Sequence, residues 1–314
     1  MVLLSKRLPS LLAVRPVRRR KILRSLEGYL FISPWIIGSL AFSLGPILAA
    51  LGVSFMRWTI EGTPRFIGLS NYVTMFTYDP RYLKSLRVTL TYVLVGVPLQ
   101  LLVALGMAVL LNQRVKGQNV FRTIFYMPAV VSGVAASILW QWMFQPDFGI
   151  INNLLKTTVG IQGPQWLYSE EWALPSMMIM KCWGVGATMV IFLAVLQDVP
   201  QHLYEAAELD GAGRWSKFRH VTLPMISPVI FFNMVMGIIG GFQTFTPGYV
   251  MTRGGPADAT LFYALYLYYN AFEYSKMGYA AAMAWVLFVI ILVITLIQFW
   301  GSRRWVYYYA GEAR

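Results

Sequence analysis

The stretch Glu205-Ala206-Ala207-Glu208-Leu209-Asp210-Gly211 stands between two long apolar segments, and Pro224 follows Gly211 by thirteen residues. We interpret the stretch as part of a short helix, because Leu203, Ala206 and Ala207 recur at the spacing of one helix face. Gly211 then supplies a turn, since glycine adopts positive φ without steric cost. A second amphipathic helix with one basic face is expected after the turn. A rigid helix–turn–helix in a loop predicts mechanical contact with a partner.

The composition is that of an integral membrane protein, because 57% of the residues are hydrophobic and only 12% are charged. About 20 helical residues cross the hydrocarbon of a bilayer, and six segments are long enough. They lie near residues 28–55, 86–111, 122–144, 174–197, 225–248 and 279–301. The sequence therefore predicts an all-α integral membrane fold with six transmembrane helices. A single domain, 28–301, would carry the polar loop at about 198–224, flanked by a basic tail (1–27) and a second tail (302–314).

Lysine and arginine predict the orientation. Residues 1–27 hold eight of them, and the segment near 112–122, the polar loop and the last tail hold three each. The loops on the opposite side hold eight over a longer stretch, beside seven acids. By the positive-inside rule, both termini and the polar loop are expected in the cytoplasm. The net charge of +13 then favours anionic lipid. Nucleic acid is not expected as a partner, because these basic residues border membrane spans and form no separate domain.

The sequence contains no recognisable catalytic set. The only histidines, His202 and His220, both lie in the polar loop without metal-ligand spacing, and no complete phosphate-binding loop is present. We therefore expect no enzymatic activity, no metal and no cofactor bound by this chain. No carboxylate falls in the middle of a span, which argues against the remote alternative of an ion-coupled carrier. If the chain moves a solute, the energy is expected to come from a partner.

Lys181 is the one charged residue expected inside a span. Two interpretations stay open: Lys181 is a structural residue, whose stem extends toward the interface or which faces a water-filled cavity, or it faces the solute path near the substrate. The fifth span carries Asn233, Gly237, Gly240 and Thr244 on one helix face, with Gln243 nearby. Small and neutral polar residues fit either close helix packing or a polar passage. Candidate residues for a substrate pathway are therefore Lys181, Asn233, Gln243 and Thr244.

The polar loop resembles a known family. The pattern Glu205-Ala206-Ala207-x3-Gly211-x9-Val221-x-Leu223-Pro224 is similar to the EAA loop of permease subunits in binding-protein-dependent ABC importers, with Val221 where isoleucine is commonest. The flanking sequence is similar to the carbohydrate branch, of the maltose and glycerol-3-phosphate type. It carries Phe192-Leu193-Ala194-x-Leu196-Gln197-x2-Pro200, Phe121-Arg122-x3-Phe125-x-Met127-Pro128, Trp140-x3-Phe144-x4-Gly149 and Thr252-x-Gly254-Gly255-Pro256-x3-Thr260. The resemblance extends from about residue 25 to the end of the chain.

The resemblance implies a six-helix permease that transmits force through the EAA loop, here residues 198–224. The residues implied in ATPase coupling are Glu205, Ala206, Ala207, Gly211, Leu223 and Pro224. Glu205 would meet a basic residue of a cytoplasmic ATPase, and Gly211 would permit the bend. The implied partners are a second, homologous permease in a heterodimer, a dimer of ATPase subunits that hold ATP and Mg, an extracytoplasmic solute-binding protein, and membrane lipid. The implied location is the inner or plasma membrane of a bacterium or archaeon.

The cargo is less well specified. Sugars stack on aromatic rings, and 15% of the residues are aromatic, but aromatic residues also gather at membrane interfaces. Trp140, Trp142 and Trp183 are possible cavity residues. We expect a neutral monosaccharide or oligosaccharide, with glycerol-3-phosphate or another polar solute as the alternative.

Overall fold

The computed structural model describes residues 16–59, 61–113 and 117–308, and side chains from residue 28 onward. The chain divides into two units, Met1–Gly52 and Val53–Arg314, called unit 1 and unit 2. The ends of both predicted tails, 1–15 and 309–314, lie outside the described residues.

Unit 1 is one helical segment. Helix α1 spans Pro16–Ser39, a π-helical turn follows at Leu40–Leu44, and α2 (Gly45–Ser54) continues across the unit boundary. Helical residues therefore extend into the segment that the sequence predicts as a tail. Residues Gly28–Ser54 are apolar enough to cross a membrane, close to the predicted span at 28–55.

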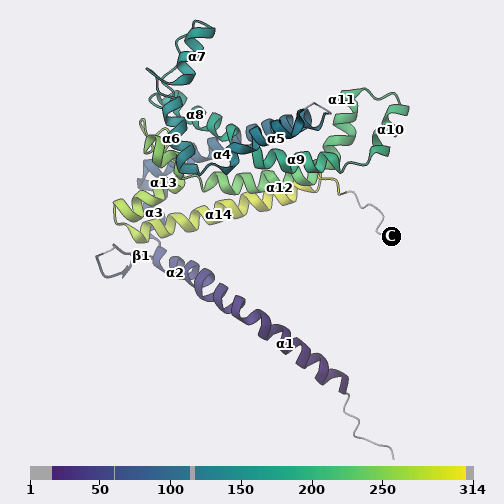
Figure 1. Cartoon of the computed structure of the whole chain (residues 1–314). Helices are drawn as coiled ribbons and strands as arrows, with labels where there is room; N and C mark the ends of the chain where they lie inside the picture. Colours follow the sequence, from purple (N-terminus) through teal and green to yellow (C-terminus); the bar gives the residue numbers. More distant parts are fainter. Residues whose placement is uncertain (1–15, 60, 114–116, 309–314) are drawn as a thin grey trace, which may run out of the picture. The chain divides into compact units, whose positions relative to one another are not determined.

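Unit 2 holds the remaining elements, which Figure 1 labels in part. Its α-helices are α3 (Ser70–Val73), α4 (Pro80–Asn112), α5 (Gln118–Tyr126), α6 (Gly133–Met143), α7 (Ile150–Thr158), α8 (Glu170–Trp183), α9 (Gly186–Gln197), α10 (Gln201–Leu209), α11 (Arg214–Lys217), α12 (Leu223–Phe242), α13 (Tyr263–Tyr268) and α14 (Met277–Ser302). Its other helical turns are at Thr74–Tyr78, Met127–Val130, Phe218–Thr222, Gly248–Thr252 and Tyr269–Glu273. A short antiparallel pair, β1 (Met56–Arg57) and β2 (Arg65–Phe66), is added to the predicted all-α fold.

The predicted six spans correspond to four long helices and two bent helix pairs within the described residues. The long helices are Gly28–Ser54, Pro80–Asn112, Arg214–Phe242 and Met277–Ser302. The third predicted span (122–144) is bent by 102° between Val130 and Gly133, and the fourth (174–197) by 47° between Trp183 and Gly186. Both bends occur where the helical hydrogen-bond ladder is interrupted by proline or glycine residues.

Helix α4 lies at the centre of unit 2 and packs against α8, α9 and α12. Two glycines of α12 bring it close to α4: a Cβ on Gly237 would lie 2.8 Å from Val97, and one on Gly241 would lie 2.8 Å from Val93. A Cβ on Gly240 would meet no neighbour. The small and polar residues on this face of the fifth span fit either close helix packing or a polar passage. At Gly237 the structure shows close packing.

Figure 1 shows α10 and α11 at one end of unit 2 and α3 and α13 at the other. Asp79 is the centre of a hydrogen-bond network at the α3 and α13 end. Its carboxylate accepts hydrogen bonds from the hydroxyls of Tyr266 (2.8 Å) and Tyr279 (2.6 Å) and from the backbone N–H of Tyr82 (3.1 Å). Burial is the main cause that raises the pKa of Tyr266, which lies in α13. Nearby, Arg81 and Asp258 form an ion pair at 2.7 Å. These contacts join the start of α4 to α13 and α14.

Candidate functional site

The predicted site residues fall in three places within unit 2, one of which is the region of Asn233, Gln243 and Thr244 in and just after α12. Those of the EAA loop lie at the α10 and α11 end, and Lys181 lies at the bend between α8 and α9. Most of the predicted residues belong to the loop.

Gly211 ends helix α10 in the way that the sequence predicts. Its φ is +76°, a value that favours glycine. The N–H of Gly211 donates to the carbonyl of Glu208 (3.0 Å), and the N–H of Ala212 donates to that of Ala207 (2.9 Å). This pair of bonds is the Schellman motif, which satisfies the last carbonyls of a helix. The turn after α10 therefore has a defined geometry.

The loop has two arms, α10 before the turn and residues 214–222 after it. The second arm differs from the prediction of a separate short helix. Residues Arg214–Phe242 form one continuous helix, in which a π-helical turn at Phe218–Thr222 joins α11 to α12. Pro224 cannot donate a backbone hydrogen bond to the preceding turn, and the wider π turn just before it accommodates that loss. The second helix of the loop is therefore an extension of the fifth span and not a separate short helix.

Two side-chain contacts tie the arms together. The hydroxyls of Tyr204 and Thr222 are hydrogen-bonded at 3.0 Å. At the tip, the ammonium group of Lys217 contacts the carboxylate of Glu208. A groove of about 310 Å³ lies at the base of the loop, and it is lined by Leu203, His220, Val221, Pro224, Met225 and Tyr307. A displacement of α10 would therefore be transmitted to the start of α12.

The exposed surface of the EAA loop carries apolar side chains. Leu209 is 90% exposed and Trp215 is 71% exposed, with the Trp215 ring stacked on Phe218. Glu205 and Ala206 are exposed beside them, whereas Ala207 is half-buried. The described residues of the chain therefore leave Leu209 and Trp215 uncovered on this loop. Sequence reasoning did not assign Leu209, although an apolar residue between Glu208 and Asp210 was a visible signal.

The remaining two coupling candidates lie away from this surface. Leu223 and Pro224 are half-buried in the first turn of α12. The structure therefore brings Glu205, Ala206 and Gly211 to the loop end and places Leu223 and Pro224 where the loop meets the span.

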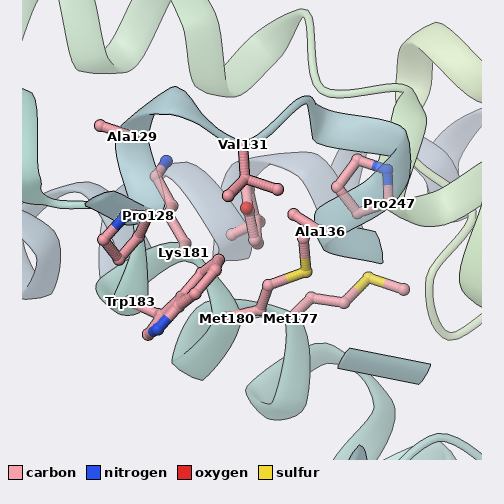
Figure 2. A pocket seen from close by; sticks show the side chains of 11 residues that line it. Pro128, Ala129, Val131, Ala136, Met177, Met180, Lys181, Trp183 and Pro247 are labelled. Carbon is pink, nitrogen blue, oxygen red and sulfur yellow. The ribbon is translucent and has the colours of Figure 1, made fainter. Parts of the chain in front are cut away.

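Lys181 lies in a cavity of about 270 Å³. The cavity is lined by Tyr92, Pro128, Ala129, Val131, Ala136, Met177, Met180, Lys181, Trp183, Gly184 and Pro247. Figure 2 shows the Lys181 side chain among these residues, with Met177, Met180 and Trp183 on the same side. The Lys181 Nζ lies 4.7 Å from the centre of the Tyr92 ring, within the range of a cation–π contact. A position in a cavity agrees both with a structural residue that faces water and with a residue of the solute path.

The two helix bends shape the cavity. Gly184 ends α8, and Gly186 begins α9 so close to α5 that an added Cβ would lie 2.5 Å from the carbonyl oxygen of Phe125. At the other bend, the hydroxyl of Ser132 caps α6 by accepting a hydrogen bond from the N–H of Ala135. Local residues therefore set where each bend falls, and the packing of α9 on α5 depends on the tertiary fold.

The other pathway candidates are not among the lining residues of this cavity. The side-chain amide of Asn233 donates to the carbonyl of Val229 in its own helix (2.9 Å), and Asn233 is buried. Gln243 and Thr244 follow the end of α12, where Gln243 is exposed and the Thr244 hydroxyl donates to Gly240 (3.4 Å). Among the residues that the structure describes, no group of three His, Cys, Asp or Glu side chains could hold a metal.

The suggested cavity tryptophans have different positions. Trp183 lines the cavity, Trp140 is buried with its ring 5.9 Å from that of Trp183, and Trp142 is 70% exposed. Sequence reasoning missed Tyr92, Met177 and Met180. No local pattern distinguishes these three residues from other core residues of a membrane helix.

Comparisons with known proteins agree with this architecture. Residues 96–307 match the family model described as "Binding-protein-dependent transport system inner membrane component". The chain is 48% identical over 292 residues to the probable ABC transporter permease protein YesP of Bacillus subtilis, covering 92% of this chain and 94% of that protein. It is 35% identical to the arabinooligosaccharides transport system permease protein AraP of the same species, covering 86% of each.

A solved structure is also similar. The chain matches one chain in the crystal structure of a bacterial ABC transporter involved in the import of the acidic polysaccharide alginate. The TM-score is 0.75 at 26% identity, and the match covers 91% of this chain and 98% of that chain.

Proposed function

The chain belongs to the family of inner membrane components of binding-protein-dependent transport systems, and we propose that it forms half of the path through which an ABC importer takes up an oligosaccharide. It is a multi-pass permease subunit and not an enzyme. The arabinooligosaccharide permease and the alginate importer among its relatives support a sugar as cargo. Glycerol-3-phosphate or another polar solute is the alternative cargo.

The EAA loop is proposed as the surface that docks on the ATPase. The observation that carries this role is the exposed side chain of Leu209, at 90%, on a helix whose end is held by the Schellman motif at Gly211. Leu209 and Trp215 would bury against the ATPase, and Glu205 would pair with a basic residue there. Ala206 would allow close approach of the two surfaces. Ala207, Leu223 and Pro224 would hold α10 against the span.

The direct helical connection supports mechanical coupling. Because Arg214–Phe242 is one helix, movement of the docked loop would reach the middle of the membrane without an intervening hinge. ATP and Mg would bind to the ATPase subunits, whose closure would draw the loops of two permeases together. The second permease is proposed to be a homologous chain in a heterodimer. Both termini and the loop would face the cytoplasm, and the binding protein would deliver sugar at the opposite end.

The Lys181 cavity is proposed as part of the substrate path. It lies at the bends of two membrane segments and combines an aromatic ring, a cation and flexible methionine side chains. Gln243 and Thr244 stay candidates for a neighbouring part of the path, since α12 ends there. The contact of Asn233 with its own helix supports a structural role for that residue.

The test uses the complete importer in proteoliposomes, with its binding protein and sugar outside. Glu205→Lys and Leu209→Ser should each lower sugar uptake and sugar-stimulated ATP hydrolysis by about tenfold or more, as expected for central contacts of an interface. Membrane insertion should be unchanged, because both side chains are exposed. Arg303→Glu, a charge reversal at an exposed residue just beyond α14, is the control and should transport normally. Normal uptake by both loop variants would contradict the docking role.

A further inference from the structure

Lys181 is the only charged residue among those that line its cavity. It belongs to the last turn of α8, just before the bend at Gly184, in the interior of a bent membrane span. A charged side chain at such depth is costly, and it is found where it faces a cavity or a partner of opposite charge. At this position, the positive charge of Lys181 is expected to have a negatively charged partner.

The described part of the chain supplies no carboxylate for this role. The ion pairs among the described residues are Arg81 with Asp258 and Lys217 with Glu208, and Lys181 belongs to neither. The centre of the Tyr92 ring lies 4.7 Å from the Lys181 Nζ. A cation–π contact stabilises the ammonium group but leaves its hydrogen-bond donors free for another partner.

Two glycines on neighbouring helices leave space for the lysine. A Cβ on Gly96 of α4 would lie 3.8 Å from the Lys181 Cδ, and one on Gly241 of α12 would lie 3.7 Å from the Nζ. The stem of Lys181 therefore passes along small residues of α4 and α12. Figure 2 shows the side chain reaching into the cavity rather than along the surface of α8.

We propose that this cavity binds the carboxylate of an acidic sugar, with the Lys181 ammonium group as its partner. This inference rests on the proposed function and narrows its cargo to saccharides that carry a uronic acid. A charge-assisted hydrogen bond would join Lys181 to the carboxylate. The Trp183 and Tyr92 rings would contact the apolar face of the sugar ring, and Met177 and Met180 would adapt to its outline.

A carboxylate fits this cavity better than a phosphate group. A phosphate ester carries a charge between about −1.5 and −2 near neutral pH, whereas the lining residues supply one cation. The rest of the lining is mostly apolar, with methionine, valine, alanine and proline side chains. A second negative charge would be left without a partner in a site of low polarity.

The test measures sugar binding to the purified membrane complex of both permeases and their ATPase subunits in lipid nanodiscs, without the soluble binding protein. Radiolabelled galacturonate and galactose differ at carbon 6, where one has a carboxylate and the other a hydroxymethyl group, and galactose 6-phosphate is the third ligand. The wild type and Lys181→Arg should bind galacturonate at least about tenfold more tightly than galactose or galactose 6-phosphate, the effect of one charge-assisted hydrogen bond. Lys181→Met, which keeps a flexible apolar stem, should bind galacturonate and galactose equally.

Four results would overturn the acidic-sugar site. They are equal binding of galacturonate and galactose by the wild type, a preference that survives in Lys181→Met, tighter binding of galactose 6-phosphate than of galacturonate, and no binding of galacturonate. ATP-driven import of a neutral oligosaccharide, measured after the same purified importer is reconstituted into proteoliposomes with its binding protein, separates the two proposals. If that import proceeds while galacturonate shows no preference, the importer function stands and the acidic-sugar site is wrong.

Discussion

The two ends of unit 2 are held in different ways. At the α3 and α13 end, the carboxylate of Asp79 binds two tyrosine hydroxyls, and Arg81 pairs with Asp258. At the EAA loop end, one hydroxyl contact and one ion pair join the arms, and Leu209 and Trp215 stay exposed. At the first end, the polar groups are hydrogen-bonded within the chain and hold the helices in place. At the second end, the uncovered apolar side chains are available to a partner. Substitutions at the two ends should therefore have separable effects on stability and on coupling.

The largest effect is expected at Gly211, where Gly211→Pro should abolish sugar uptake and sugar-stimulated ATP hydrolysis. Proline fixes φ near −65° and lacks the N–H that donates to Glu208, so the turn after α10 cannot form. Gly211→Ala keeps the N–H but adopts the left-handed conformation at a cost of about 1–2 kcal/mol. It should give an intermediate loss in the same assay.

Gly213→Ala is the matched control for these variants. Gly213 has an ordinary φ of −71°, and a Cβ added there meets no atom within 4 Å. Uptake by Gly213→Ala should equal that of the wild type. If both alanine variants transported equally, the left-handed turn at Gly211 would not be the feature that positions α10.

Asp79→Ala should produce the opposite result, a loss of stability without loss of coupling. The substitution removes the acceptor of both tyrosine hydroxyls and the N-cap of α4, which together are worth about 3 kcal/mol. The melting temperature of the purified importer should fall, while ATP hydrolysed per sugar imported by the folded fraction should not change. Asp79→Asn retains one acceptor oxygen, so its melting temperature should fall less than that of Asp79→Ala. A normal melting temperature with a raised ATP-to-sugar ratio would contradict the division between the two ends.

The sequence predicted the EAA loop well because its information is local. The turn at Gly211 and the helix before it depend on neighbouring residues, and both are present in the structure. The continuous helix through Pro224 was missed because proline usually interrupts a helix, and only the π turn before it resolves the conflict.

The opposite end and the cavity could not be predicted in the same way. Asp79 lies 187 residues from Tyr266 and 200 from Tyr279 in the chain, so their contact depends on how distant helices pack. The surroundings of Lys181 depend likewise on Tyr92 of α4 and on two helix bends whose angles no local pattern gives. The sequence identified Lys181 as unusual because a charge within an apolar span is costly wherever its neighbours lie.

The smallest effect is expected at the contact between Tyr204 and Thr222, which joins α10 to the foot of α12. Tyr204→Phe removes one partly buried hydrogen bond, worth about 1 kcal/mol, so uptake should fall only a few-fold while the ATP hydrolysed per sugar rises. Thr222→Val alone should have a similar effect. Because the two hydroxyls serve one contact, the double variant should lose little more than either single variant. If the losses of uptake in the two single variants simply added in the double variant, the contact between Tyr204 and Thr222 would not be what transmits movement from α10 to α12. The ion pair between Lys217 and Glu208 would then be the connection to test.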